Sequence, residues 1–283
     1  MAETFGRYTV LDRLGVGALG ELFRARDTTS GRTVALRVVS NDLLDDADRR
    51  ARLLADLRAA TRLSHPGIAA LYEVVEEGEG AGPSFFVQEF VPGASLTQLA
   101  DGRPMPERLA IGYALEVADA LADAHAMGIE HGYLTGANVM VTPKGRVKLL
   151  DVGFAGWTRA GGATRRPDVP ALGSLLSELV TGRPSAARGT VDSRTVSMRD
   201  DVGVVVAAMA DGEGGYESMA TAAAALRTLA ESRDAQVPAP VPPPFPPRTR
   251  GASHNTARPA LRWGLVLLAA LAAAVAVWVA TGL

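Results

Sequence analysis

The chain has 283 residues, 47% of them apolar and 21% charged, and no cysteine, which excludes a chain that is disordered throughout, a disulfide scaffold and a thiolate metal site. The formal net charge is −2, but residues 248–262 hold four arginines and no acidic residue, so the remaining chain is more acidic than this number suggests. An acidic globular part argues against nucleic acid as a partner.

The first predicted elements are strands on either side of a glycine-rich turn. Residues 8–14 form an extended run, and further runs at 21–26 and 33–39 favour strands. The turn between the first two runs has the G-x-G-x-x-G pattern, with its glycines at Gly15, Gly17 and Gly20. A dinucleotide-binding loop of this pattern would open a helix, whereas a strand follows here. The order predicts an antiparallel hairpin, as in the lid that covers ATP phosphates in protein kinases.

From this point the sequence resembles the eukaryotic-like Ser/Thr protein kinases of bacteria, over residues 7–232. Arg37 stands where the resemblance places the phosphate-binding lysine of the V-A-I-K motif. Asp56, in a helical stretch at 45–63, takes the place of the glutamate that pairs with this lysine. Because arginine is longer than lysine and aspartate shorter than glutamate, Arg37 and Asp56 could still pair. We expect such a pair to be structural, since a planar guanidinium does not place charge as an ammonium does.

The middle of the chain resembles the kinase hinge and the helix that follows it. Residues 85–91 are similar to the strand that enters the hinge, with Gln88 as gatekeeper and Glu89 next to it. Apolar spacing at 109–127 predicts the long helix that leads into the catalytic loop.

The predicted catalytic loop, residues 131–138, departs most from the family pattern H-R-D-L-K-P-x-N. Tyr133 replaces the aspartate that accepts the substrate proton, and a phenol of pKa near 10 is protonated at neutral pH. Thr135 replaces the lysine that neutralises the transferring phosphoryl group. Asn138 remains, and Asp151 stands for the aspartate of the D-F-G triplet, so both oxygen ligands expected for Mg²⁺ are retained.

Two further observations argue against phosphoryl transfer. Lys144 and Lys148 are the only lysines of the chain, so no lysine of the N-terminal lobe can take over the role lost at Arg37. The stretch from Asp151 to Asp168 is short for an activation segment and contains no A-P-E motif. The platform that docks a substrate peptide is therefore expected to be largely missing.

The C-terminal end predicts a membrane anchor. Residues 263–283 carry no charge, and at ~1.5 Å per residue a helix of this length spans roughly the 30 Å hydrocarbon core of a bilayer. A buried globular helix is the alternative. The linker at 233–262 contains seven prolines within 237–247, which favours a semi-rigid spacer. The arginines before the span place the N-terminal domain in the cytoplasm of a single-pass protein of the cell membrane.

These observations predict an α+β fold with two lobes like a protein kinase, a β-rich N-lobe at about 7–91, a helical C-lobe at about 92–232 and a shortened activation segment, followed by one transmembrane helix. We interpret the chain as a membrane-tethered pseudokinase, a regulatory or scaffolding module in bacterial signalling or cell-envelope processes. The alternative is an active atypical Ser/Thr kinase that uses Mg-ATP. A third reading is a folded anchor that binds no ligand.

The candidate sites follow from the resemblance. No residue is assigned a catalytic role, because the degenerate positions are Arg37, Asp56, Tyr133 and Thr135. The candidate nucleotide-binding residues are Gly15, Gly17, Gly20, Arg37, Glu89, Asn138 and Asp151, the last two also being the candidate Mg²⁺ ligands. Thr158 and Thr164 are candidate phosphorylation sites for an active Ser/Thr kinase, and phosphothreonine would be readable by an FHA-domain partner. Unmodified loop threonines are the alternative.

Overall fold

The computed structural model describes residues 3–76, 82–154, 157–158, 162–163, 167–183, 200–210 and 215–234. No helix within these ranges is long and apolar enough to cross a membrane. The expected span at 263–283 and the proline-rich stretch before it lie outside the described residues, and so does Thr164.

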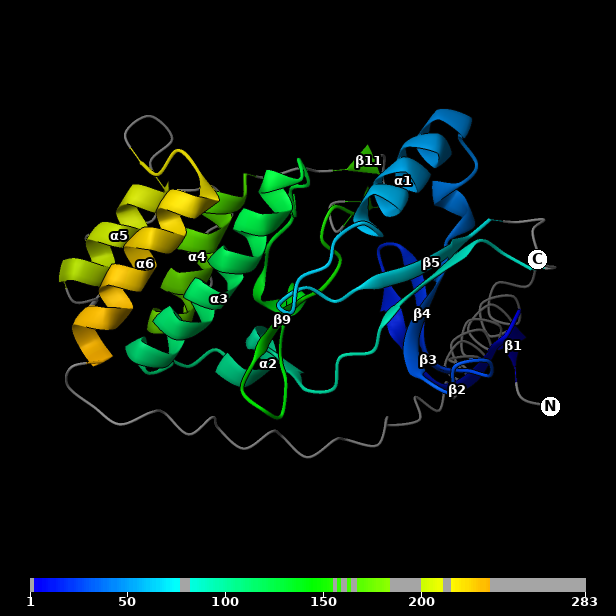
Figure 1. The fold of residues 1–283 in the computed structure, drawn as a ribbon, viewed down its shortest axis with the longest axis horizontal. Coiled ribbons are helices and arrows are strands. Elements are labelled where there is room, and N and C mark those ends of the chain that lie inside the picture. The colour runs from blue at the N-terminus through cyan, green and yellow to red at the C-terminus, as the bar shows by residue number, and fades with distance from the viewer. Residues whose placement is uncertain are drawn as a thin grey trace, which may run out of the picture. The chain divides into compact units, whose positions relative to one another are not determined.

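A six-stranded antiparallel sheet forms the N-terminal lobe (Figure 1). The strand order is β1-β2-β3-β4-β6-β5. The strands are β1 (Thr4–Phe5), β2 (Tyr8–Gly17), β3 (Gly20–Asp27), β4 (Thr33–Val39), β5 (Leu71–Val75) and β6 (Phe85–Glu89). The predicted glycine hairpin is confirmed, because β2 and β3 pair down to Gly17 opposite Gly20.

Alternate residues of the strands pack on opposite faces of this sheet, as the period of two in a strand requires. On β6, Phe85 and Val87 lie in an apolar cluster with Leu36, whereas Phe86 lies in a second cluster with Leu57. Leu57 belongs to α1 (Ala47–Ala60), which follows a 3₁₀ turn η1 (Asn41–Leu43). Helix α1 therefore covers the face of the sheet to which Phe86 belongs.

The expected helix at 45–63 is confirmed in a shorter form. Asp46 caps it, because its carboxylate accepts a hydrogen bond from the backbone N–H of Arg49 at 2.7 Å. Such a cap typically stabilises a helix by about 1 kcal/mol. Leu53 and Leu57 are fully buried against the sheet, which holds Asp56 on a neighbouring part of the helix surface.

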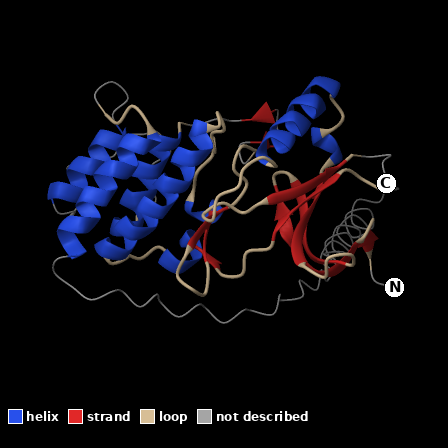
Figure 2. Cartoon of the chain, viewed as in Figure 1, coloured by secondary structure: helices blue, strands red, loops and turns tan. Residues whose placement is uncertain are grey.

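The C-terminal lobe is helical (Figure 2). Its helices are α2 (Leu96–Ala100), α3 (Glu107–Ala126), η2 (Gly136–Asn138), α4 (Asp168–Thr181), α5 (Asp200–Ala210) and α6 (Met219–Asp234). Helix α3 packs against α4 and α6, and their apolar faces share one buried core. Gly173 allows α4 to approach α5 closely, since a Cβ there would lie 2.7 Å from the Cβ of Met209.

Two small sheets lie outside the six-stranded sheet. The first joins β7 (Ala94–Ser95), β8 (Val139–Val141) and β9 (Val147–Leu149), and the second joins β10 (Trp157–Thr158) and β11 (Gly162–Ala163). The two-lobed α+β architecture expected from the sequence is thereby confirmed. Asp151 follows β9 by two residues and contacts Arg37 of the N-terminal lobe.

Candidate functional site

Arg37 is a buried cation on the α1 side of the N-lobe sheet. Its cross-strand neighbours are Leu22 and Phe86, and directly paired residues project from the same face. The guanidinium carbon lies 5.8 Å from the centre of the Phe86 ring, within the range of a cation–π contact. Only 8% of Arg37 is exposed, so its charge needs a partner inside the protein.

That partner is Asp151. Nη2 of Arg37 lies 3.2 Å from Oδ2 of Asp151, which is 114 positions away in the sequence. Asp151 has a φ of +59°, a left-handed conformation that aspartate tolerates better than most residues. Nε of Arg37 and Oδ1 of Asp151 are buried and have no hydrogen-bond partner among the described residues. The pair joins the two lobes, and each member keeps unused hydrogen-bonding capacity.

The possible pairing of Arg37 with Asp56 is not what the structure shows. Asp56 accepts a hydrogen bond from Nε1 of Trp157 at 2.9 Å instead. The aspartate is one methylene shorter than the family's glutamate, and the indole N–H reaches it from the segment after Asp151. Arg37 thus pairs with Asp151, and Asp56 is bonded to Trp157, which lies six positions further along the chain.

Side chains of the segment after Asp151 fill the space under α1. Phe154 and Trp157 are buried in the cluster that contains Phe86 and Leu57. The rings of Phe86 and Phe154 meet edge to face, with centroids 5.3 Å apart. Leu19, at the tip of the glycine hairpin, is buried in the same cluster. Sequence reasoning did not assign roles to Phe154 and Trp157, because no spacing pattern marks their partners.

The glycine hairpin lies directly over Arg37. A Cβ on Gly17 would lie 3.4 Å from Nη1 of Arg37, and one on Gly20 would lie only 2.0 Å from the carbonyl oxygen of Val38. Gly20 is therefore required for the close approach of β3 to β4. Gly15 lies at the exposed end of β2, opposite Leu22. The structure brings together Gly17, Arg37 and Asp151 from the predicted set.

The catalytic loop is held by Asp168, the first residue of α4. Its carboxylate accepts hydrogen bonds from the backbone N–H groups of His131 and Gly132 at 2.8 and 2.9 Å, and Nε2 of His125 lies at 2.8 Å. Burial alone would raise the pKa of Asp168, but these contacts hold the pKa below its ordinary value. Burial lowers the pKa of His131, so this ring is neutral at pH 7 and acts in packing.

Thr135 and Asn138 are bonded to each other within the loop. The hydroxyl of Thr135 donates to Oδ1 of Asn138 at 2.7 Å. The carbonyl oxygen of Asn138 accepts from the N–H of Leu150 at 2.8 Å, which places Asn138 beside the Asp151 segment. Tyr133 is half-buried on the same loop, and its N–H donates to Nδ1 of His131 at 3.4 Å. The loop position at which the family pattern has an aspartate therefore carries a phenol.

Glu89 and Lys148 form an ion pair behind the strand that enters the hinge. Nζ of Lys148 lies 2.6 Å from Oε2 of Glu89 and 3.4 Å from the carbonyl oxygen of Ile68. Lys148 is therefore committed to Glu89 rather than to Asp151. This contact removes one of the two lysines from any role in charge neutralisation at the site.

Comparison with known proteins places this geometry in a family. A family model described as protein kinase domain matches residues 8–169, more than half of the chain. The chain belongs to the protein kinase family. Its similar proteins include bacterial serine/threonine kinases, and the N-lobe sheet, the hinge strand and the loop held by Asp168 are the parts of a protein kinase domain.

The matched relatives are longer proteins. PknB of Mycobacterium leprae is 33% identical over 205 residues, which cover 63% of this chain and 33% of that protein. The DNA damage-responsive kinase RqkA of Deinococcus radiodurans is 31% identical over 205 residues, or 63% of this chain and 30% of that protein. The chain thus spans about a third of the length of the curated relatives it matches.

Solved structures show the same fold. The kinase domain of Mycobacterium tuberculosis PknI has a TM-score of 0.68 with 26% sequence identity, covering 80% of this chain and 98% of that domain.

Protein kinases bind ATP together with Mg²⁺, but the residues of this kinase domain do not fit that ion. One carboxylate oxygen of Asp151 faces the Arg37 guanidinium, and Oδ1 of Asn138 accepts the Thr135 hydroxyl. Two unit charges ~4 Å apart interact by about 4 kcal/mol at an effective dielectric constant of ~20, and a divalent cation beside a guanidinium would be repelled about twice as strongly. The Arg37 charge also neutralises the Asp151 carboxylate, so its orphaned oxygen, Oδ1, attracts Mg²⁺ less strongly than an unpaired carboxylate would.

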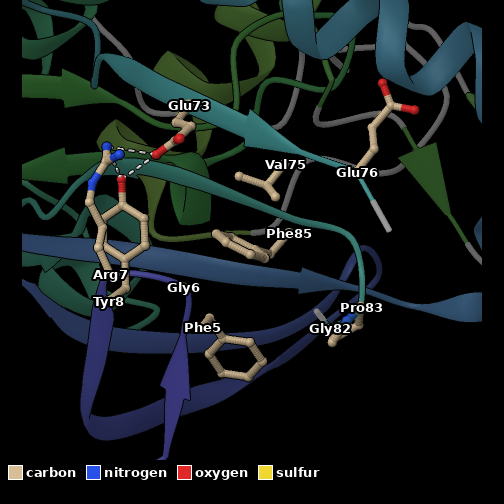
Figure 3. Close-up of a pocket in the computed structure, with 10 residues that line it drawn as sticks. All are labelled: Phe5, Gly6, Arg7, Tyr8, Glu73, Val75, Glu76, Gly82, Pro83 and Phe85. Carbon is tan, nitrogen blue, oxygen red and sulfur yellow. Dashed lines mark hydrogen bonds and ion pairs between the residues drawn. The ribbon is translucent and has the colours of Figure 1, made fainter. Parts of the chain in front are cut away.

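A separate hollow lies on the other side of the N-lobe sheet (Figure 3). It is lined by apolar side chains that include Phe5, Val75 and Phe85. At one rim Arg7 and the Tyr8 hydroxyl both contact the Glu73 carboxylate, which satisfies these polar groups. Burial and this hydrogen bond raise the pKa of Tyr8. None of the predicted nucleotide-binding residues lines this hollow.

The stability of the Arg37–Asp151 pair can be tested by a double-mutant cycle. Arg37→Met is expected to lower the free energy of unfolding by about 3–5 kcal/mol, because it leaves the Asp151 carboxylate buried without its cation. Combining Arg37→Met with Asp151→Asn should cost at least about 2 kcal/mol less than the sum of the two single losses. Urea denaturation of the full-length chain in mild detergent, followed by circular dichroism, measures these energies.

The matched control for this cycle is Arg146→Met. Arg146 is exposed and pairs with Glu116 at 3.4 Å, so its replacement is expected to change stability by no more than about 1 kcal/mol. Strictly additive losses for Arg37 and Asp151 would contradict the energetic coupling of the pair.

Proposed function

We propose that this chain is a membrane-tethered pseudokinase, a kinase fold that acts by binding partners rather than by transferring phosphate. The observation that carries the proposal is the Arg37–Asp151 ion pair. In an active kinase the corresponding lysine binds ATP phosphates and the aspartate binds Mg²⁺. Here the two side chains pair with each other, so Asp151 faces a guanidinium where the metal-dependent reaction requires Mg²⁺.

The catalytic loop supports the same proposal. Tyr133 presents a phenol where the family has the carboxylate that accepts the substrate proton. Thr135 adds no positive charge and donates its hydroxyl to Asn138. Each tenfold loss of rate corresponds to about 1.4 kcal/mol of lost transition-state stabilisation, and removal of one group of a cooperating catalytic set commonly costs several such factors.

The alternative is an active atypical Ser/Thr kinase. It is favoured by the retained Asn138 and Asp151, which the hydrogen bond from Leu150 N–H to the Asn138 carbonyl brings close together. It is also favoured by the names of the relatives, which describe serine/threonine kinases. The two functions differ in one measurable event, the transfer of the γ-phosphate.

We expect the purified full-length chain to transfer no γ-phosphate from labelled ATP to itself or to a general protein acceptor. The physical reason is the missing base at Tyr133 and the missing ammonium at Arg37. An active bacterial Ser/Thr kinase, assayed in parallel, is the positive control. Transfer that disappears in Asp151→Ala would identify an active kinase and overturn the proposal.

The proposed role is a scaffold or regulator in bacterial signalling or cell-envelope processes. We include Thr158 and Thr164 as phosphorylation sites for an active kinase on the same membrane. Phosphothreonine adds about −1.5 to −2 charges, and the neighbouring arginines Arg159, Arg165 and Arg166 would balance part of this charge. An FHA-domain protein is the partner proposed to read the phosphothreonine.

Incubation with an active bacterial Ser/Thr kinase and ATP is expected to phosphorylate Thr158 or Thr164, because both lie in the short stretch between Asp151 and α4. Mass spectrometry of the digested chain locates the phosphate, and the Thr158→Ala/Thr164→Ala double variant is the control. Phosphate found only at other positions, or none at all, would remove this regulatory role.

The membrane tether predicts the distribution of the chain after cell fractionation. The full chain should sediment with membranes, and deletion of residues 263–283 should move it to the supernatant, because the deletion removes the uncharged segment. Deletion of residues 237–247 shortens the chain without removing that segment and should leave it in the membrane fraction. A full chain found in the supernatant would contradict the tether.

A further inference from the structure

Arg37, at the position of the family's lysine, places its positive charge against the aspartate that the family uses to bind Mg²⁺. Arg37 is nine-tenths buried and contacts Asp151 through Nη2. Its Nη1 is the atom nearest to Gly17 of the glycine hairpin. Its Nε is buried with no partner in the described part of the chain. One side of the guanidinium is therefore used by Asp151, and further N–H donors remain for another acceptor.

We infer that this site binds a nucleoside triphosphate as the metal-free anion, with Arg37 as its phosphate ligand, and that divalent cations oppose binding. The inference rests on the pseudokinase proposal and names the ligand state of the same site. It departs from the sequence-based expectation of Mg-ATP. The observation behind it is that Oδ2 of Asp151 and Oδ1 of Asn138 already accept donors, from Arg37 and from Thr135, which leaves Oδ1 of Asp151 as the carboxylate oxygen without a donor.

The chemistry of the guanidinium suits a phosphate in this position. Its N–H groups form a planar fork that can bond two oxygens of one phosphate. The glycine hairpin packs over Arg37 without a side chain at Gly17, so an anion could approach the guanidinium there from the backbone side. A metal ion would compete with Arg37 for Asp151 and would also withdraw charge from the phosphates.

Asp151 has the opposite role to that in a metal-dependent kinase. In a metal site its carboxylate helps to hold the nucleotide through the cation. Beside Arg37, with no cation, it competes with the phosphates for the same guanidinium. Removal of its charge should therefore strengthen binding of the metal-free nucleotide, whereas it should weaken binding of Mg-ATP.

The experiment is isothermal titration calorimetry of the full-length chain in mild detergent. ATP is titrated first in EDTA and then with excess MgCl₂. We expect binding in EDTA and an affinity at least about tenfold weaker in excess Mg²⁺. A thermal shift under the same two conditions is the second readout, since a ligand that binds only the folded chain stabilises it. Adenosine, which has no phosphate, should not respond to changes at Arg37.

Two variants test the roles of the pair. Asp151→Asn should tighten ATP binding in EDTA by at least about threefold, because Arg37 is released for the phosphates. A misfolded variant cannot gain affinity, so loss of fold cannot mimic this result. Arg37→Met should weaken ATP binding in EDTA by at least about tenfold, and Arg146→Met, the exposed control, should bind as the unchanged chain does.

Each outcome distinguishes this inference from the proposed function. ATP binding that requires Mg²⁺ and is lost in Asp151→Asn would overturn the inference and leave the pseudokinase proposal in place. Absence of ATP binding in both conditions would overturn it as well. Phosphate transfer dependent on Asp151 would overturn the proposed function itself.

Discussion

The ion pair between Arg37 and Asp151 is the contact on which the site depends. It connects strand β4 of one lobe with Asp151, two residues after β9, of the other. A buried pair recovers its desolvation cost only when the remaining polar atoms are also satisfied, and here Nε of Arg37 and Oδ1 of Asp151 have no partner within the described ranges. The pair is thus better explained as a device that fixes a particular arrangement than as a large source of stability.

Because Arg37 pairs with Asp151, the carboxylate of Asp56 has a different partner from the one expected from the sequence. Asp56 does not take Arg37 as its partner, and the indole N–H of Trp157 donates to its carboxylate. Trp157 and Phe154 then pack between α1 and the Leu19 tip of the glycine hairpin. The tip of the glycine hairpin, α1 and the residues after Asp151 therefore share one apolar cluster beside the ion pair.

The fold was predictable from the sequence, whereas the contacts of the site were predictable only in part. The strand–glycine–strand order and the periodicity of α1 and α3 are local patterns, and the structure confirms them. The partner of Arg37 did not follow, because side-chain length gives only reach, and the outcome depends on where Trp157 lies in space. The ion pair of Lys148 with Glu89 was missed for the same reason: the residues are 59 positions apart.

The contrast between Asp168 and Asp151 explains how a kinase fold can keep its shape after changes at its catalytic positions. Asp168 bonds to backbone N–H groups of His131 and Gly132, and any chain that follows this loop path presents those donors whatever chemistry it performs. Loss of Asp168 would leave buried N–H groups unpaired, which is costly. Asp151 instead needs a positive charge, and either a metal ion or an arginine can supply it. The backbone therefore constrains the first aspartate, while the second can exchange its cation and change what the site binds without a change of fold.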